Sequence, residues 1–371
     1  MFVFHEKLSS LPTDRDIVLF AERQAVTDRV EKEYFVSRLL EEENVLSALC
    51  SEKKIPGESL KKAALADLAE LFSRKREPGP LADYLPSVKR TLPFHEYQES
   101  FEKLVAADTP EDFLAALIAH YTAFGAGEAA KYLAFRWENG LVGIENPDPI
   151  RLDSLFCLER QKQELTDNIR AFLEGRPANN VLLYGNSGCG KSSMVKALLN
   201  EYYREGLRLV QIRREDLAEL PTLVRMVGGM PFRYIVFMDD LSFEGDDTNY
   251  KALKTILEGG IERQPANLLF IATSNRFHLV NETWEERQGS DVHVSDTRNE
   301  KLSLSERFGI RISFVSPGQN EYLNIIEGIL RENGIAFTPE IRAEALRWAA
   351  FYNGKSGRTA SQFARAVVAR T

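Results

Sequence analysis

One stretch, residues 180–193, restricts the possible folds of this chain more than any other part of the sequence. It is NVLLYGNSGCGKSS, in which a short apolar run leads into a glycine-rich turn, and a helix-compatible segment, residues 194–203, comes next. The spacing matches the G-x-x-x-x-G-K-[ST] pattern in the strand, loop and helix setting that this pattern requires. We therefore predict an α/β fold in which a parallel sheet carries a phosphate-binding loop.

The spacing suits a polyphosphate that lies against consecutive backbone N–H groups at the N-terminus of a helix. Glycines keep such a turn open, because side chains there would hold the phosphates away. Lys191 is expected to contact the β- and γ-phosphates, and the Ser192 hydroxyl to bind the Mg²⁺ that bridges them. An ordinary glycine turn is the alternative interpretation. The expected phosphate-binding residues are Gly185, Asn186, Ser187, Gly188, Cys189, Gly190, Lys191, Ser192 and Ser193.

A second apolar run, residues 234–238, ends in two carboxylates, Asp239 and Asp240. The run is typical of a buried strand, and ligands of parallel sheets bind at the carboxyl ends of the strands. Asp239 is expected to bind Mg²⁺ together with Ser192, while Asp240 positions the attacking water. An apolar run that ends in two aspartates is a weak signal alone, but downstream of the phosphate-binding loop it predicts a nucleotide site.

A third apolar run, residues 268–274, ends at Asn275. In a parallel sheet its polar end would lie at the same edge as the phosphates. Asn275 is therefore a candidate to orient the lytic water or to sense the γ-phosphate. The alternative is a turn residue that closes a strand.

The C-terminal part changes from strand to helix. Arg307 precedes an aromatic-glycine turn and an expected strand, residues 310–315. Beyond Pro317 the apolar residues recur at helical spacing, and glycines and N-cap residues divide the segment into three helices. Arg358 lies at the start of the last of them.

Residues 1–148 carry no recognised catalytic motif. Apolar residues recur at helical spacing in 26–40 and 60–72, and Thr109 is placed as the N-cap of a further helix. Another helix is expected from Glu128 towards position 139, where Gly140 would end it. The region is either a module that binds a partner or substrate, or a packing domain that completes a core.

Composition excludes several classes. The formal net charge of -8 gives no global field that attracts nucleic acid or an anionic membrane, although a local basic patch stays possible. No apolar run approaches the roughly 18 residues of a membrane span, and the start of the chain lacks a signal peptide's design, so we expect a cytoplasmic protein. The three widely spaced cysteines suggest neither a disulfide framework nor a metal site.

The order of these motifs resembles that of the AAA+ ATPases over about residues 150–371. More narrowly, the segments DDLSFE at 239–244, TSNRFHL at 273–279 and LSLSERFG at 302–309 resemble a bacterial family catalogued as domain of unknown function 815. The resemblance implies an ATPase architecture but no pathway.

Carried over to this sequence, the resemblance implies a role for each polar residue. Lys191 and Ser192 would contact phosphate and Mg²⁺, and Asn275 would be sensor 1. Arg358 would be sensor 2, and Arg307 would be an arginine finger that contacts the γ-phosphate of a neighbouring subunit, which implies an oligomer. For both arginines the alternative is a surface ion pair.

Two departures from the AAA+ pattern matter. Most AAA+ ATPases have glutamate after the Mg²⁺-binding aspartate, whereas Asp240 is one methylene shorter. Asp240 then positions water poorly or leaves the task to Glu244, so hydrolysis is expected to be slow. In addition, residues 215–221 offer no aromatic side chain of the kind found in protein-threading members. A switch or loader is therefore favoured over a processive unfoldase.

We therefore predict an α/β P-loop NTPase of AAA+-like type. A mainly helical N-terminal domain, 1–148, is expected to precede an ATP-binding core, 149–316, and a helical lid, 317–371. The expected cofactors are ATP and Mg²⁺, and the expected activity is that of an oligomeric ATPase that remodels or loads a partner.

Three alternatives remain. The first is an ATP-regulated scaffold with negligible hydrolysis. The second is a P-loop kinase or GTPase, which the missing N-K-x-D guanine motif and the lid arginine disfavour. The third is a DNA-associated loader, which depends on analogy and on local basic residues. These residues are Arg213, Arg214, Arg365 and Arg370.

Overall fold

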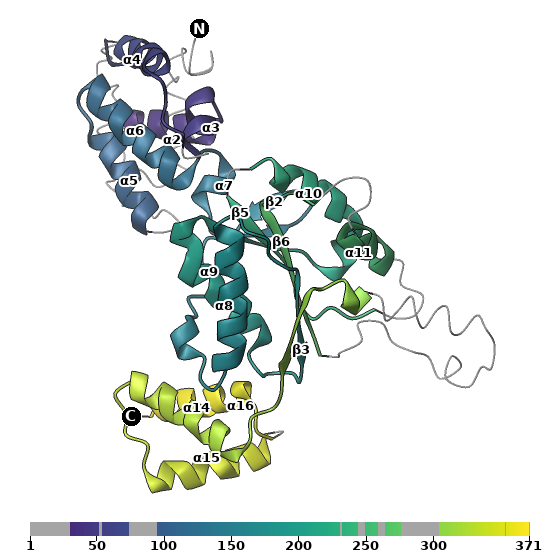
Figure 1. The fold of residues 1–371 in the computed structure, drawn as a ribbon. Helices are drawn as coiled ribbons and strands as arrows, with labels where there is room; N and C mark the ends of the chain where they lie inside the picture. The colour runs from purple at the N-terminus through teal and green to yellow at the C-terminus, as the bar shows by residue number, and fades with distance from the viewer. Residues whose placement is uncertain are drawn as a thin grey trace, which may run out of the picture. The chain divides into compact units, whose positions relative to one another are not determined.

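The computed structural model describes residues 30–51, 54–73, 95–230, 232–243, 249–258, 264–275, 304–352 and 354–370 (Figure 1). The chain forms two compact units. The first takes in the described parts of Met1–Leu133 and Gly143–Asn146, and the second those of Ala134–Val142 and Pro147–Thr371. The separation therefore falls close to the linker expected near residue 148, but one short segment, 134–142, joins the second unit.

The first unit is a bundle of helices around an apolar core. Phe113, Leu117 and Tyr121 of helix α6 (Pro110–Phe124) are buried in the same apolar cluster as Val36 and Leu39 of helix α2 (Val30–Glu41). Helix α6 begins as its sequence predicts, because the Thr109 hydroxyl accepts a hydrogen bond from the Asp112 backbone N–H. The helices are α2 (Val30–Glu41), α3 (Val45–Ser51), α4 (Glu58–Ser73), α5 (His95–Ala106), α6 (Pro110–Phe124) and α7 (Glu128–Lys131).

The helix predicted from Glu128 towards position 139 is wrong beyond its first turn. Helix α7 ends at Lys131, and Ala134–Trp137 forms strand β1, which pairs in parallel with strand β4 (Leu207–Gln211). Arg136 is the one exposed residue of β1, and the other three are buried. Among these, Trp137 donates its indole N–H to the Glu219 carboxylate at 2.6 Å. Pairing with a distant strand therefore overrode the local helical spacing.

His120 is one of the buried titratable groups of the helical unit. Its ring packs edge-on against Tyr97, with 4.8 Å between ring centroids, and its Nδ1 is 3.0 Å from the Ser100 hydroxyl. Burial lowers the pKa of His120 from 6.5 to about 3. The folded unit therefore holds this imidazole neutral.

We predict that His120 makes the helical unit sensitive to acid. Because its pKa is lower in the folded state, the unfolded chain takes up the proton first, and stability is lost as the pH falls from about 6.5 towards 3, by at most about 1.4 kcal/mol per pH unit. Hydrogen exchange of α5 and α6 in the full chain, corrected for intrinsic pH dependence, measures this loss. His120→Leu should flatten the pH dependence, and its behaviour at pH 8 reports the packing change alone. An equal pH dependence in both proteins would contradict the prediction.

The second unit is built on a seven-stranded sheet with the order β2-β1-β4-β5-β6-β3-β7. Strand β3 lies between β6 and β7 and pairs in parallel with both. The P-loop that follows β3 therefore emerges beside the ends of its neighbours. The remaining strands are β2 (Leu141–Gly143), β3 (Val181–Gly185), β5 (Arg233–Met238), β6 (Leu268–Ser274) and β7 (Ile310–Phe314).

Helices cover both faces of this sheet. Helices α8 (Glu159–Leu173) and α9 (Lys191–Tyr202) lie on one face, and α10 (Leu220–Gly228) and α11 (Asn249–Glu258) lie on the other (Figure 1). All seven residues of β6 are buried, as expected of a strand covered on both sides. The apolar runs that the sequence marks as strands at 181, 234 and 268 are confirmed as central strands of the sheet.

Three helices after β7 form the lid. They are α14 (Gln319–Glu332), α15 (Pro339–Phe351) and α16 (Gly357–Val368), and their core contains Tyr322, Ile326 and Phe363. The Ser356 hydroxyl caps α16 by accepting a hydrogen bond from the Thr359 N–H. With this lid, the predicted fold class is confirmed: a parallel sheet core with a helical lid, after a helical N-terminal region. Among the described helices, none combines the length and apolar character that crossing a lipid bilayer needs.

Candidate functional site

The loop between β3 and α9 has the geometry of a P-loop. Gly185, Gly188 and Gly190 all have positive φ values, of 133°, 75° and 93°. A side chain at Gly185 would overlap the backbone carbonyl of Phe314 in β7, so glycine is required there by contact as well as by conformation. The loop therefore presents backbone rather than side chains at the N-terminus of α9, as anion binding requires.

Lys191 begins α9 and is buried beneath the loop, with only 7% of its surface exposed. Its ammonium donates hydrogen bonds to the carbonyl oxygens of Gly185 at 2.7 Å and Asn186 at 2.9 Å, and to Oδ1 of Asn275 at 2.9 Å. Burial lowers the pKa of Lys191, while the nearby carboxylates of Asp240 and Asp239 oppose the shift. The cation is thus surrounded by oxygen acceptors.

Ser192 and Asp239 meet as the sequence predicts for a Mg²⁺ pair. The Ser192 hydroxyl donates to Oδ1 of Asp239 at 2.6 Å, and the hydroxyl of Thr273 donates to the same oxygen at 2.6 Å. No described group of three or more His, Cys, Asp or Glu side chains could hold a metal by itself. A hydroxyl and one carboxylate fit Mg²⁺, which is usually bound by one or two carboxylates together with substrate phosphates.

Asp240 has an unusual backbone conformation, with φ at 52°. Left-handed residues other than glycine cost roughly 1–2 kcal/mol, although aspartate tolerates the conformation better than most. Its backbone N–H donates to the Thr273 hydroxyl at 2.8 Å, and its Oδ1 accepts from Nδ2 of Asn275 at 2.7 Å. Asn275 thus bridges the lysine of the P-loop and the second aspartate with the two ends of one amide.

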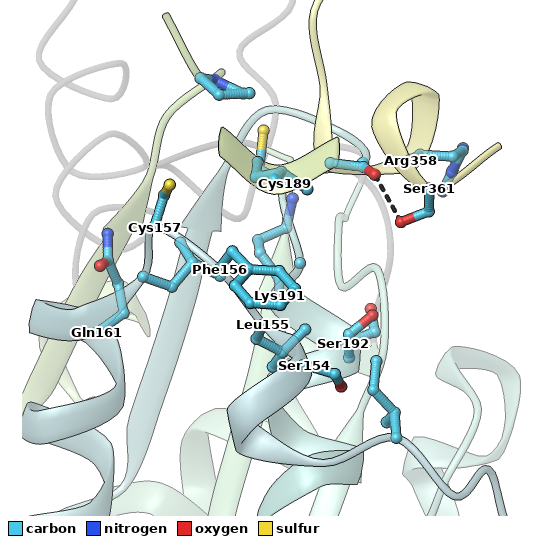
Figure 2. Close-up of a pocket in the computed structure, with 18 of the residues that line it drawn as sticks. Ser154, Leu155, Phe156, Cys157, Gln161, Cys189, Lys191, Ser192, Arg358 and Ser361 are labelled. Carbon is cyan, nitrogen blue, oxygen red and sulfur yellow. Dashed lines mark hydrogen bonds between the residues drawn. The ribbon is translucent and has the colours of Figure 1, made fainter. Parts of the chain in front are cut away.

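These residues line a single cavity of 1340 Å³. The P-loop and the ends of β5 and β6 form one side, where Lys191, Ser192 and Asp239 lie. The segment before α8 forms another side, and helices α14 and α16 of the lid contribute the rest. Figure 2 shows Leu155 and Phe156 in front of Lys191 and Ser192, with Arg358 of α16 across the opening. A phosphorylated ligand with an apolar or aromatic part fits such a mixed lining.

The structure thus brings most of the predicted site residues together. Arg358 lines the cavity, and its backbone N–H donates to the Gly188 carbonyl at 3.0 Å. Glu244, the alternative water-positioning residue, lies outside the described residues. The predicted residues that line the cavity are Ser187, Gly188, Cys189, Gly190, Lys191, Ser192, Ser193, Asp239, Asp240, Asn275 and Arg358.

Arg307 lies elsewhere. It is exposed in the turn before β7 and is not among the residues that line the cavity. Ile310, three residues after Arg307, pairs with Val181 at the start of β3, whereas the P-loop begins at the other end of that strand, about 13 Å further along. The structure therefore does not place this arginine at the site of its own subunit.

The segment before α8 is the part of the site that sequence reasoning missed. Phe156 packs against the backbone of Gly328 in α14, where a Cβ would lie 2.6 Å from the ring. Cys157, with φ at 61°, donates from its Sγ to the Glu321 carbonyl at 3.8 Å, and burial raises its thiol pKa. Only the apolar run at 155–158 signalled this wall, and such a run does not identify a ligand contact.

Comparison with known proteins gives the family. Residues 130–371 match the family described as "Protein of unknown function (DUF815)". The chain belongs to this family. The resemblance drawn from the sequence motifs is thereby confirmed.

More distant similarities are limited in extent. A replication factor C large subunit from Staphylothermus marinus is 29% identical over 90 residues, which are 24% of this chain and 21% of that protein. A mutant RuvB of Thermotoga maritima has a TM-score of 0.40 and 16% identity, covering 58% of this chain and 64% of that one. ORC1 of Aeropyrum pernix, in complex with DNA, has a TM-score of 0.42 and 15% identity, covering 59% and 62%. The chain spans less than two thirds of each of these proteins.

We predict that Lys191→Ala abolishes the binding or turnover of ATP and leaves the fold intact. The change removes the ammonium that would contact the phosphates, while the sheet and helix α9 on either side of the loop keep their own packing. Calorimetric titration with Mg-ATP measures the affinity, and circular dichroism checks the fold. Lys103→Ala, at an exposed position of α5, is the matched control and should bind ATP like the wild type. Unchanged affinity and turnover in the Lys191 variant would remove the P-loop from the proposed site.

Proposed function

We propose that this protein is a Mg²⁺-dependent ATP-binding protein and ATPase of AAA+ type. The main support is that Lys191, Ser192 and Asp239 line one cavity. In this cavity the Ser192 hydroxyl lies 2.6 Å from the Asp239 carboxylate. Lys191 would supply a cation for the β- and γ-phosphates, and Ser192 and Asp239 would supply two oxygen ligands for Mg²⁺. The AAA+-like sheet and lid support the same assignment.

Binding of the phosphates would use contacts that the loop already holds in place. The loop backbone receives the phosphates at the N-terminus of α9, and Lys191 exchanges at least one of its three oxygen acceptors for a phosphate oxygen. Mg²⁺, when bound, supplies charge neutralisation between the β- and γ-phosphates. Asn275 is the acceptor best placed to be exchanged, because the other two belong to the loop itself.

Asp240 is proposed to position the attacking water. Its carboxylate lines the cavity and is fixed by Asn275 at 2.7 Å, on the same edge of the sheet as Asp239. The shorter side chain is expected to place the water less favourably than glutamate does, which supports slow hydrolysis as part of the proposal.

We predict that Asp240→Asn preserves ATP affinity and suppresses hydrolysis at least 10-fold. Asparagine keeps the size and tolerates the left-handed backbone, but it cannot accept a proton or orient water as a carboxylate does. Steady-state phosphate release and calorimetry measure the two properties. Glu244→Gln is the matched control, and loss of turnover in that variant alone would move the water-positioning role to Glu244.

Arg307 is proposed to act on the site of a neighbouring subunit. It is exposed in the turn before β7 and is not among the residues that line the cavity of its own subunit, which supports a role at the γ-phosphate of a neighbour. An arginine finger supplied in trans typically raises turnover by about 10³ to 10⁵. The proposal therefore includes a homo-oligomer whose active sites are shared.

We predict that turnover per subunit rises with protein concentration, and that Arg307→Ala binds ATP nearly normally but hydrolyses it poorly. Mixing that variant with Lys191→Ala should restore part of the activity, because the Lys191 variant still carries an intact finger. Phosphate release at several concentrations and mixing ratios measures both effects. Concentration-independent turnover from a monomeric wild type, with Arg307→Ala equally active, would refute the shared site.

A switch or loader that remodels a protein partner is the proposed role. The segment 214–219, which replaces an aromatic pore loop, is a short 3-10 helix fixed by the Trp137–Glu219 hydrogen bond and by the 2.8 Å ion pair of Arg213 with Asp216. Residues 215–221 carry no aromatic side chain that could grip a threaded chain, which supports a switch or loader over a threading motor. A cytoplasmic location belongs to the same proposal.

The alternative roles remain open to direct test. A scaffold would bind ATP without turnover, whether or not a partner is present. For a DNA-associated loader the basic residues offer little support, since Arg213 pairs with Asp216, Arg214 donates to the Ser242 carbonyl, and Arg370 pairs with Glu344 at 2.6 Å. Affinity capture with Asp240→Asn in the presence of ATP would identify a partner, and binding of DNA there would favour the loader.

A further inference from the structure

Thr273 is a residue at the centre of the site to which the motif pattern assigns no role. It lies on β6 two positions before Asn275, lines the cavity, and is only 1% exposed. Its hydroxyl and its carbonyl together make three hydrogen bonds to consecutive residues at the end of β5. A buried hydroxyl whose two hydrogen bonds are both satisfied restricts the geometry of the groups that it contacts.

The hydroxyl connects the two aspartates. It donates to Oδ1 of Asp239 at 2.6 Å and accepts from the backbone N–H of Asp240 at 2.8 Å. A threonine hydroxyl has one proton to give, so with that proton on the carboxylate its lone pairs are free for the N–H. The two bonds are therefore compatible and define the orientation of the hydroxyl.

The carbonyl of Thr273 completes the arrangement by accepting from the Leu241 N–H at 2.7 Å. The backbone N–H groups of Asp240 and Leu241, which follow β5, thus both donate hydrogen bonds to Thr273 of β6. Between them Asp240 takes its left-handed conformation, with φ at 52°, and its carboxylate reaches the amide of Asn275. Thr273 therefore holds the backbone on both sides of Asp240, and its hydroxyl holds one carboxylate oxygen of Asp239.

We propose that Thr273 is the positioning residue that adapts a pair of aspartates to ATP hydrolysis. Its hydroxyl holds Asp239 beside Ser192 for Mg²⁺, and it turns the backbone of Asp240 so that a carboxylate one methylene shorter than glutamate faces the cavity. The inference rests on the proposed ATPase function, since it assigns a role within that reaction.

Thr273→Val and Thr273→Ser separate this role from simple packing. Valine has nearly the same shape but can neither donate to Asp239 nor accept from Asp240, whereas serine keeps both bonds and loses only a methyl group. If Thr273 merely fills space, the valine variant should lose less activity than the serine variant. If Thr273 positions the carboxylates, the serine variant should lose less activity than the valine variant.

The experiment measures three quantities in the full chain: turnover at saturating Mg-ATP, the Mg²⁺ concentration for half-maximal turnover, and ATP affinity in EDTA. For Thr273→Val we expect turnover to fall at least 10-fold and the half-maximal Mg²⁺ concentration to rise several-fold, with unchanged affinity in EDTA. Thr273→Ser should stay within about threefold of the wild type. Thr222→Val, at an exposed position of α10, is the matched control and should change none of the three.

Valine values within twofold of the wild type would overturn the proposal, as would a serine variant as impaired as valine. Should the valine variant not fold, Thr273→Ala poses the same question, because it also removes both bonds. A wild type that binds ATP without turnover would refute hydrolysis, yet the gain in ATP affinity on adding Mg²⁺ would still test the contact with Asp239. That gain should shrink in Thr273→Val, and an unchanged gain would overturn the proposal. A wild type that binds no ATP refutes the proposed function itself.

Discussion

A buried ammonium group dominates the site. Lys191 lies beneath the P-loop, where an unpaired cation would be very costly, so the surrounding chain must supply oxygen atoms at hydrogen-bond distance. The carbonyls of Gly185 and Asn186 do so from the loop, which is possible because the glycines allow its backbone to turn inward. The third oxygen comes from Asn275, and through this amide the lysine is connected to Asp240. The other polar groups are arranged around this one charge.

The strand order explains why residues so far apart in sequence can provide hydrogen-bond acceptors for the Lys191 ammonium. Strand β6 lies between β3 and β5, so the end of β6 is next both to the P-loop and to the two aspartates. Thr273 pairs with Leu183 of β3, and Ala272 pairs with Met238 of β5. Thr273 can then bond the residues that follow β5, while Asn275, two positions later and just beyond β6, contacts Lys191. The parallel register, rather than any local motif, sets these distances.

Features that follow local patterns could be predicted from the sequence, whereas features that the strand register sets could not. Lys191, Ser192, Asp239 and Asn275 each stand at the end of a strand or the start of a helix that a local pattern marks, so their place beside one another could be predicted, while their roles stay predictions. Strand β1 could not, because four residues with helical neighbours on one side acquire their conformation only by pairing with β4. The role of Thr273 was equally hidden, since a buried threonine in a strand is ordinary until the register shows which carboxylate it contacts.

The lid and the segment before α8 both contact the P-loop or each other through close backbone contacts. The Gly188 carbonyl accepts from the first turn of α16, while Leu158 packs near Gly190, and Phe156 rests on Gly328 of α14. A shift of the P-loop backbone on phosphate binding would therefore move two lid helices and the segment at 147–158 together, because these contacts are too close to slide freely. A change in the P-loop backbone would thus reach the lid helices and the segment before α8, all within the second unit, through contacts that the cavity lining already makes.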